Sequence, residues 1–564
     1  MHCQLEYLAR CLPGRIQHAL DELPSTLDAT YERTLQEIDG TNWEFARRLL
    51  HCVAVVSRPL RVEELAEFLS FDFNAGQIPE YHEDWRLEDP ADAVLSTCST
   101  LLSLVDVENS QVIQFSHFSI KEFLTSSRFL EKRNTISSRY HLSLTPAHAL
   151  VAKTCLGVLF HIDKDVTRST LRRFPLAEYA AEHWFEHARF EGVSQNAEAG
   201  MLQMFDQRNS HLAVWLWICD PTIQFWTQNN SAHAPMTPHG TPLHYAAFCG
   251  LYDIVKVLAT EYPQDVNSGS FIGEETPLHL TSRAGHIVPA RLLIEHGAAA
   301  AQDNYLTTLL YLASGLGHVD LARLLIEHGA DAAAQNKVGT TPLHMASVRG
   351  SVDLARLLIE HGADMTAQNE YLHEASKRGH VALARLLIEH GANAAAQSED
   401  GTFLYEASLR GHVDVVRLLA EHGADAAARG RHGTTPLHAA SKWGNVGLVR
   451  LLIEHGADAA AQNKHGATPL HAASKRGHID VAGLLIEHGA DAAAQGNDGM
   501  TPLHAAAKRG HVGLARLLIE HGANAAARSK DGTTPLHRAS KRGHVGLARL
   551  LIEHGADAAA PMPC

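Results

Sequence analysis

TPLHAASKRGHIDVAGLLIEHGAD, residues 468–491, is the stretch that decides the fold of much of this chain. Its threonine and proline predict a helix start, because a threonine hydroxyl caps free N–H groups and proline presets the first helical turn. Gly477 predicts the end of this short helix. Val481 and Leu484 then lie on one face of a second helix, which ends at Gly489. The stretch therefore predicts two antiparallel helices joined by a turn.

The same unit recurs at a nearly constant interval. TPLH begins at Thr241, Thr276, Thr341, Thr435, Thr468, Thr501 and Thr534, and altered versions begin at Thr308, Glu370 and Thr402. The ten starts are separated by 35, 32, 33, 29, 32, 33, 33, 33 and 33 residues. A unit of this size cannot bury its apolar face alone, so we expect the units to stack into an all-α solenoid.

These units resemble the ankyrin repeat, in which TPLHxAAxxGH is followed by a segment like LLIEHGAD. The resemblance covers roughly 320 residues of the chain. It implies about ten helix-turn-helix units with hairpin turns, and a function in binding another protein. We expect the repeat array to occupy residues 236–564, preceded by a winged-helix-like region at 1–140 and a helical connector at 141–235.

Three units depart from the pattern. The unit at Glu370 is four residues short and lacks both the threonine cap and the proline. The units at Thr308 and Thr402 lack the proline. We therefore expect a shortened or missing hairpin at residues 368–371, and lower local stability between residues 300 and 405.

The first part of the chain also has helical patterns. Thr26 precedes a periodic run at 27–35, a second helix start lies at 58–65, and an acidic loop follows. Residues 112–115, Val-Ile-Gln-Phe, predict a short strand, and a helix is expected from Ser119 to about Ser126. Helices, a short strand and a further helix are compatible with a winged-helix arrangement.

This region resembles the tail of a NACHT-type signalling NTPase of the fungal kind related to NOD-like receptors. The matching stretches are LPSTLDATYERTLQEI, SRPLRVEELAEFL and FSHFSIKEFL, and residues 175–192 resemble the helical connector before ankyrin arrays in that family. A NACHT NTPase needs a GxxxxGK[ST] loop to hold nucleotide phosphates, and this chain has none. His117 stands where a family histidine senses the phosphate, and we interpret it here as a packed structural histidine.

Composition excludes several classes of function. Residues 1–230 carry 20 Lys/Arg against 31 Asp/Glu, and the remainder carries 28 against 32, so neither part has the basic excess of a nucleic-acid binder. A DNA-binding winged helix is disfavoured for the same reason. The eight cysteines are scattered without a CxxC pair, which predicts free thiols in a reducing compartment. No apolar run reaches the length of a membrane span, and we expect a cytoplasmic protein without membrane contact.

The 39 histidines invite a metal site, but most follow the repeat and so stack along the solenoid instead of converging. Structural hydrogen bonding at turns and helix ends is the preferred interpretation. No GxSxG, HExxH, GxGxxG or paired-carboxylate motif occurs in a convincing context. We therefore expect no catalytic residue, no cofactor and no bound metal.

The candidate binding residues precede the glycine that ends each first helix. We call them the basic ladder: Arg349, Lys377, Arg378, Arg410, Lys442, Trp443, Lys475, Arg476, Lys508, Arg509, Lys541 and Arg542. Cations here also complement the helix dipole, which accounts for a single cation in any one unit. In ankyrin proteins these positions face the concave binding surface, so a ladder over seven units predicts an acidic or phosphorylated protein partner. Trp443 either anchors that partner or packs on the neighbouring hairpin.

The hairpin tips vary between otherwise similar units, which suits a recognition surface, although exposed tips also vary freely. These tip residues are Arg431, His432, Lys464, His465, Asn497, Asp498, Lys530 and Asp531.

The sequence thus predicts a non-enzymatic interaction protein. The resemblance implies the sensor or scaffold part of a NOD-like-receptor-type signalling protein. The alternatives are a fragment of a STAND-class signalling ATPase whose nucleotide-binding domain is missing from this chain, and a ligase or signalling adaptor.

Overall fold

The computed structural model describes residues 26–38, 40, 42–107, 110–132, 134–222, 238–270, 274–298, 309–336, 338–398 and 401–559. The chain divides into two compact units, Met1–Asn304 and Tyr305–Cys564. None of the helices in the described ranges combines the length and the apolar character needed to cross a bilayer.

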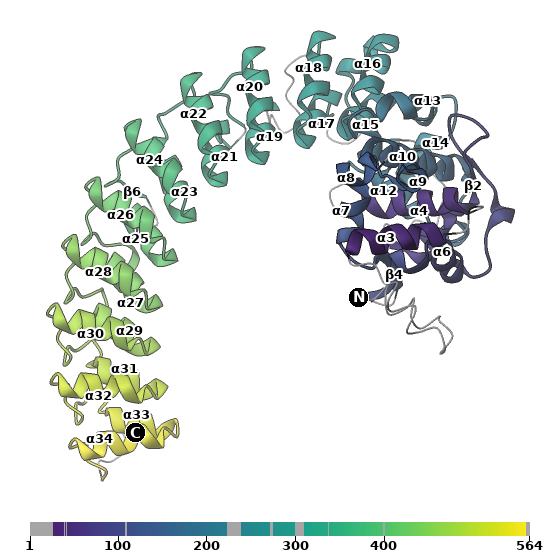
Figure 1. Cartoon of the computed structure of the whole chain (residues 1–564). Coiled ribbons are helices and arrows are strands. Elements are labelled where there is room, and N and C mark those ends of the chain that lie inside the picture. Colours follow the sequence, from purple (N-terminus) through teal and green to yellow (C-terminus); the bar gives the residue numbers. More distant parts are fainter. Residues whose placement is uncertain are drawn as a thin grey trace, which may run out of the picture. The chain divides into compact units, whose positions relative to one another are not determined.

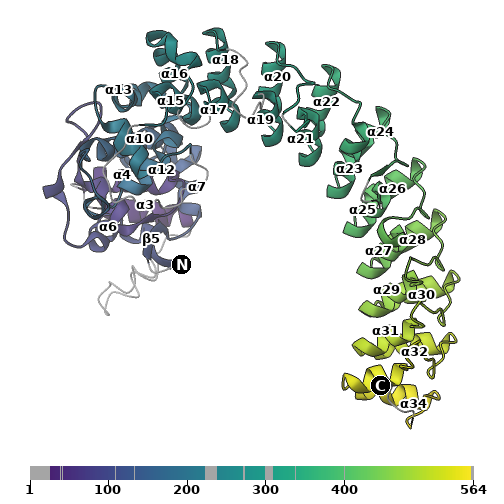
Figure 2. The ribbon, with the colours of Figure 1, turned by 180° about the vertical axis from the view of Figure 1, so that it is seen from behind.

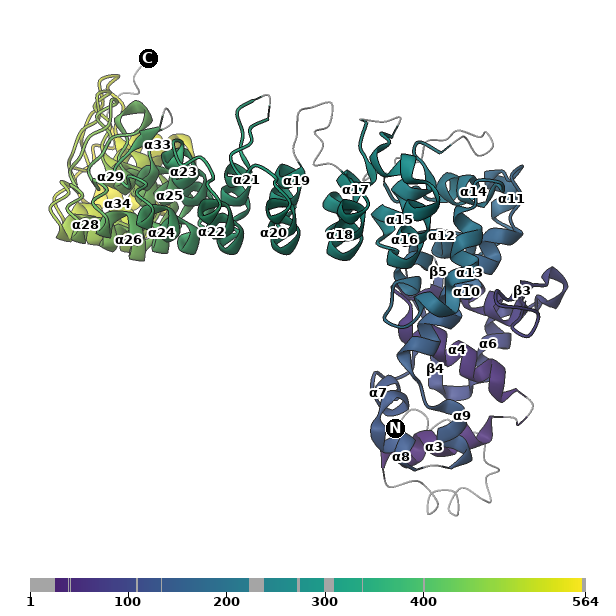
Figure 3. The ribbon, with the colours of Figure 1, turned by 90° about the horizontal axis from the view of Figure 1, so that it is seen from above.

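The second unit is a stack of helix pairs in two layers (Figures 1 and 2). The first helices of the pairs are α19 (Leu309–Leu316), α21 (Pro342–Arg349), α23 (Gln368–Arg378), α25 (Phe403–Arg410), α27 (Pro436–Trp443), α29 (Pro469–Arg476), α31 (Pro502–Arg509) and α33 (Pro535–Lys541). The second helices are α20 (Val319–Glu327), α22 (Val352–Glu360), α24 (Val381–Glu389), α26 (Val413–Glu421), α28 (Val446–Glu454), α30 (Ile479–Glu487), α32 (Val512–Glu520) and α34 (Val545–Glu553). The turns between repeats extend from one side of this unit (Figure 3).

The quoted unit shows why each pair forms. Thr468 is the N-cap of α29, its side chain accepts a hydrogen bond from the N–H of His471, and Pro469 is the first helical residue. Gly477 ends α29 in the left-handed conformation with φ +84°. Val481 and Leu485 of α30 are fully buried. The predicted helix starts, ends and apolar face are confirmed.

Small side chains let the first helices approach one another. Ala440, Ala473 and Ala506 are fully buried at equivalent positions, and first helices pack more closely on their neighbours than second helices do. A serine usually follows in the next position, and six of these hydroxyls are buried without a hydrogen-bond partner: Ser314, Ser347, Ser376, Ser408, Ser441 and Ser474. Ala507 takes this place in α31.

The four-residue deletion removes a hairpin, as expected. Helix α23 has 11 residues and begins at Gln368 after Ala367, with no side-chain cap. The Tyr371 hydroxyl instead donates a hydrogen bond to the Asp364 carbonyl at 2.8 Å, which holds the start of the helix against the preceding turn. A two-stranded turn, β6 (Gln397–Ser398) and β7 (Gly401–Thr402), follows. The lower stability expected between 300 and 405 stays a prediction, and Thr308 lies outside the described residues.

The first unit begins with a small helical domain around a three-stranded antiparallel sheet of order β1-β5-β4. Its elements are α3 (Leu27–Glu37), α4 (Trp43–Val55), β1 (Leu60–Arg61), α5 (Val62–Ala66), β2 (Phe71–Asp72), β3 (Glu80–Tyr81), α6 (Pro90–Cys98), β4 (Leu102–Val107), β5 (Ser110–Phe115), α7 (Ser119–Thr125), α8 (Ser127–Glu131) and α9 (Thr135–Tyr140). The strand at 112–115 and the helix from Ser119 are confirmed. Strands β1 and β4 were not predicted.

Further helices join this domain to the first two repeats. They are α10 (Leu144–His161), α11 (Arg168–Leu171), α12 (Ala177–Ala188), α13 (Ser194–Phe205) and α14 (His211–Ile218), followed by the repeat helices α15 (Pro242–Cys249), α16 (Tyr252–Glu261), α17 (Pro277–Ala284) and α18 (Ile287–Glu295). The buried Glu67 carboxylate accepts a hydrogen bond from the Leu176 N–H at 2.7 Å, just before α12.

The packing continues from these helices into the array. The rings of Trp215 and Tyr245 meet edge to face at 6.5 Å, and Arg283 donates a hydrogen bond to the Thr222 carbonyl at 3.1 Å. The first two repeats therefore belong to the first compact unit.

Substitutions at the two glycines of the quoted unit distinguish the cost of backbone strain from the cost of steric crowding. Both have positive φ, but a Cβ on Gly477 would lie 2.6 Å from Nδ1 of His511, whereas a Cβ on Gly489 would meet nothing within 4 Å. We expect Gly489→Ala to cost about 1 kcal/mol of unfolding free energy through strain, and Gly477→Ala to cost about 1–2 kcal/mol more. Urea denaturation of the full chain measures both. Equal losses in the two variants would contradict the crowding.

The unpartnered serines predict stabilising substitutions. Ser474→Ala removes a buried hydroxyl and leaves the shape that Ala507 already has, so it is expected to raise the unfolding free energy by about 1 kcal/mol. Ser540→Ala, at the equivalent but exposed position of α33, is the control and should change little. Urea midpoints at equal protein concentration measure both effects. A lower midpoint for Ser474→Ala would show that the hydroxyl has a partner.

Candidate functional site

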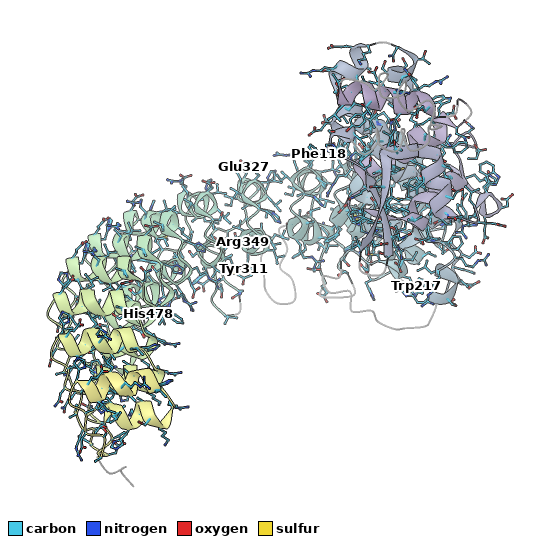
Figure 4. All side chains as sticks on the ribbon, turned by 60° about the horizontal axis from the view of Figure 1, so that its bottom comes forward. Phe118, Trp217, Tyr311, Glu327, Arg349 and His478 are labelled. Carbon is cyan, nitrogen blue, oxygen red and sulfur yellow. The ribbon has the colours of Figure 1, made fainter. Side chains whose placement is uncertain are left out.

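The basic ladder lies at the C-terminal ends of the first helices, as the sequence predicted. Every ladder side chain is exposed except that of Lys377, which is half-buried. Figure 4 shows Arg349 with Tyr311 on the first-helix side of the stack and Glu327, from a second helix, on the opposite side. The ladder therefore lies on the first-helix side of the second unit.

The ladder's first members are tied to the protein's own groups. The Glu374 carboxylate forms ion pairs with Lys377, at 3.6 Å, and with Arg378, at 3.3 Å. Arg410 pairs with the Glu406 carboxylate at 3.9 Å. Arg349 donates a hydrogen bond from Nη1 to the Gly315 carbonyl at 3.3 Å. These cations line an open groove together with Trp443.

Trp443 stands at the end of this groove. Its side chain is 56% exposed. The Lys442 ammonium lies 5.5 Å from the ring centroid, and the Arg476 guanidinium carbon lies 5.9 Å from it. These distances suit cation–π attraction, and the exposed 56% of the side chain leaves part of the ring open to an apolar group from outside.

From Lys442 onward the ladder cations have no ion pair among the described residues. Sequence reasoning missed two features that bear on this contrast. The carboxylates Glu374 and Glu406 stand three or four residues before ladder cations, a spacing that predicts helix ion pairs. Arg538 adds a half-buried cation to α33, where the neighbouring units have alanine.

The hairpin tips are joined to one another by their backbones. An N–H of each tip donates to a carbonyl of the preceding tip, in the pairs Lys464 to His432 at 2.9 Å, Asn497 to His465 at 2.8 Å and Lys530 to Asp498 at 2.8 Å. The Asp531 carboxylate accepts hydrogen bonds from the Thr533 N–H and the Ser529 hydroxyl, which hold its pKa at about 2. The described tip side chains are exposed, and the Arg431 side chain lies outside the described part.

The repeat histidines make structural hydrogen bonds, as expected. In TPLH, Nδ1 of His471 accepts the Thr468 N–H at 3.1 Å, so Nε2 carries the proton and donates to the Met500 carbonyl of the next repeat at 3.0 Å. In GH, Nε2 of His478 donates to the Lys442 carbonyl of the preceding repeat at 3.2 Å. In most EHG segments, Nδ1 of the histidine donates to the carbonyl four residues earlier, as His455 does to Leu451 at 2.9 Å.

No group of three or more His, Cys, Asp or Glu side chains converges on a metal-sized site within the described ranges. The five described cysteines are free thiols, and burial raises the pKa of those at 52, 98, 155, 219 and 249.

The interpretation of His117 as a packed histidine is wrong. Its ring is exposed beside Phe118, which is 73% exposed. Nδ1 of His117 lies 2.6 Å from the Ser119 hydroxyl, which in turn lies 2.8 Å from the Tyr31 hydroxyl. The residue precedes α7 and bonds to the first residue of that helix, so its polar contact is made at the surface.

Comparisons with known proteins agree with this geometry. The family model "Ankyrin repeats (3 copies)" matches residues 243–336, 307–369, 367–430, 427–496 and 491–561. The model "GPI inositol-deacylase, winged helix domain" matches residues 31–135. A relative, "Azaphilone pigments biosynthesis cluster protein L" of Monascus ruber, is 26% identical over 303 residues, which are 50% of this chain and 63% of that protein.

The TPLH histidines predict loss of stability in mild acid. Burial lowers the pKa of His438, His471 and His504 in the folded chain, whereas an unfolded histidine titrates near about 6.5. The unfolded chain therefore binds more protons below that pH, and the unfolding free energy should fall as the pH falls from about 7 to 5. Urea midpoints against pH measure this. The H438Q/H471Q/H504Q variant should have a flatter profile, and an unchanged slope would contradict the assignment.

Proposed function

Because this chain belongs to the ankyrin-repeat family, we propose that it is a non-enzymatic protein that binds an acidic or phosphorylated protein partner on the first-helix side of its array. The single observation that carries this proposal is the exposed row of cations on successive first helices. Repeat proteins use such extended, preformed surfaces to bind other proteins. Cations in a row steer an acidic partner and select against a basic one.

The two sides of the array support this choice of surface. The second helices expose arginine and glutamate four residues apart, as in Arg450 with Glu454 and Arg516 with Glu520. Such a face has charges of both signs and little net field. The first-helix side has mainly one sign, which favours it as the recognition face.

The winged-helix match supports a role in regulated signalling. Residues 31–135 match a winged-helix model, and this region has the strand at 112–115 and the helix from Ser119 that the sequence pattern predicts. We propose that the chain acts in the cytoplasm as the sensor or scaffold part of a NOD-like-receptor-type signalling protein. In that role the array binds the partner, and the helices from α10 to α14 connect it to the winged helix.

Two other functions keep their own signatures. A STAND-class ATPase fragment would be recognised by a nucleotide-binding domain in the same protein. A ligase or signalling adaptor would be recognised by a partner with those activities.

Affinity capture from native cell extract with the full chain tests the proposal. The ladder variant changes Arg349, Lys377, Arg378, Lys475, Arg476, Lys508 and Arg509 to alanine. The control variant changes seven exposed second-helix arginines to alanine: Arg323, Arg356, Arg385, Arg417, Arg450, Arg516 and Arg549. We expect a partner that wild type and control retain and that the ladder variant loses by about tenfold or more.

Circular dichroism melting of all three chains checks that the variants stay folded. Equal recovery of the partner by the ladder variant and the wild type would contradict a binding site on the first-helix side.

A further inference from the structure

The basic ladder has two parts that differ in how their charges are balanced. Helices α23 and α25 contain the carboxylates that pair with Lys377, Arg378 and Arg410. Helices α27, α29, α31 and α33 contain no Asp or Glu at all. We call the ladder cations of this second part, together with the neighbouring Arg538, the cationic strip: Lys442, Lys475, Arg476, Lys508, Arg509, Arg538, Lys541 and Arg542.

Few acidic groups lie near the strip, and the charge of Arg538 adds to the hydrogen bonds that lower the pKa of Asp531 on the adjacent tip. The second helices behind it present arginine and glutamate together, and the tips beside it contain both Lys530 and Asp531. The described strip cations make no ion pair. A cation that is paired with a carboxylate attracts an anionic ligand weakly, because the carboxylate offsets its charge. An unpaired row of cations attracts the same ligand more strongly. The strip is therefore the stronger part of the ladder for an anionic partner.

The strip begins at an aromatic side chain. Trp443 is 56% exposed, lies close to both Lys442 and Arg476, and also lines the groove. An exposed ring at the border between a groove and a charged row suits a ligand with an apolar residue next to an acidic stretch.

The spacing of the repeats constrains the ligand further. Packed helices lie about 8–10 Å apart, and an extended chain advances about 3.3 Å per residue. An extended peptide that crosses the strip therefore passes one repeat about every three residues. Carboxylates at every third position would each meet the cations of one first helix.

We propose that the ligand of the array is an extended acidic peptide segment. It would have Asp or Glu at about every third residue along the strip and an apolar residue on Trp443. This inference rests on the proposed function and adds that the cationic strip, not the whole ladder, supplies the affinity. A protein segment fits better than nucleic acid because the chain has a net charge of −15, which repels a long polyanion beyond the strip.

Fluorescence anisotropy with the full chain and labelled synthetic peptides tests this inference. The probe has one phenylalanine followed by four glutamates at every third position, with serine and glycine between them. The strip variant K475A/R476A/K508A/R509A is matched by the groove variant R349A/K377A/R378A/R410A, which also removes four cations. We expect the strip variant to weaken binding about tenfold or more and the groove variant less than about threefold. Trp443→Ala should weaken binding of the probe but not binding of a version that lacks the phenylalanine.

If peptide binding were weakened equally in the two variants, the special role of the strip would be overturned. The proposed function would stand, because the ladder as a whole would still bind an acidic peptide. Equal binding of a peptide with its four glutamates in one block would overturn the spacing. Tighter binding of a phosphoserine version by tenfold or more would overturn the assignment to carboxylates, and equal competition by single-stranded RNA would overturn a protein partner. A wild-type chain that binds none of the peptides, yet retains a ladder-dependent partner from extract, would overturn this inference alone.

Discussion

Each repeat can bury its apolar side only against the next one, and the contact between first helices makes this packing close. Alanines such as Ala473 keep the helix surfaces near one another, and the imidazole of His471 bonds its own helix start to a carbonyl of the following repeat. At several first helices the terminal glycine is favoured because its φ is positive and the histidine of the next repeat lies against it, as His511 does on Gly477. Loss of any one of these contacts would weaken the interface between neighbouring units.

The same contact sets the binding surface. Because the inner positions of the first helix are occupied by alanine, serine and histidine, the long side chains of its last turn extend into solvent. They recur once per repeat, so the spacing of the packed helices also sets the spacing of the exposed charges. The similar units from Thr435 onward repeat the cations without an acidic partner in the same helix, unlike α23 and α25 with Glu374 and Glu406.

Much of this fold could be predicted from the sequence because its signals are local. A cap, a proline and a glycine mark the first helix of each regular repeat within ten residues, as Thr468, Pro469 and Gly477 do. The missing hairpin before α23 follows from the four-residue shortening of its repeat. Strand β1 is two residues long and pairs with residues 112 and 113, far along the chain, so no local pattern reveals it. The bond from Leu176 to Glu67 joins segments 109 residues apart and is equally invisible.

The sequence predicted where the ladder residues lie, but not which of their cations form ion pairs. The ladder residues follow from the repeat, whereas the pairing of Lys377 with Glu374 depends on which side chains point together. The i,i+3 spacing was a usable signal. The exposure of His117 was not predictable, because a histidine before a helix can be packed or free depending on what covers it.

Hydrogen–deuterium exchange of the full chain with and without its captured partner shows which side of the array is covered. A partner on the first-helix side would slow exchange at the ends of α27, α29, α31 and α33, with little change in the second helices α28, α30, α32 and α34. Protection confined to the second helices, or to the winged-helix region before α10, would contradict a partner bound on the first-helix side.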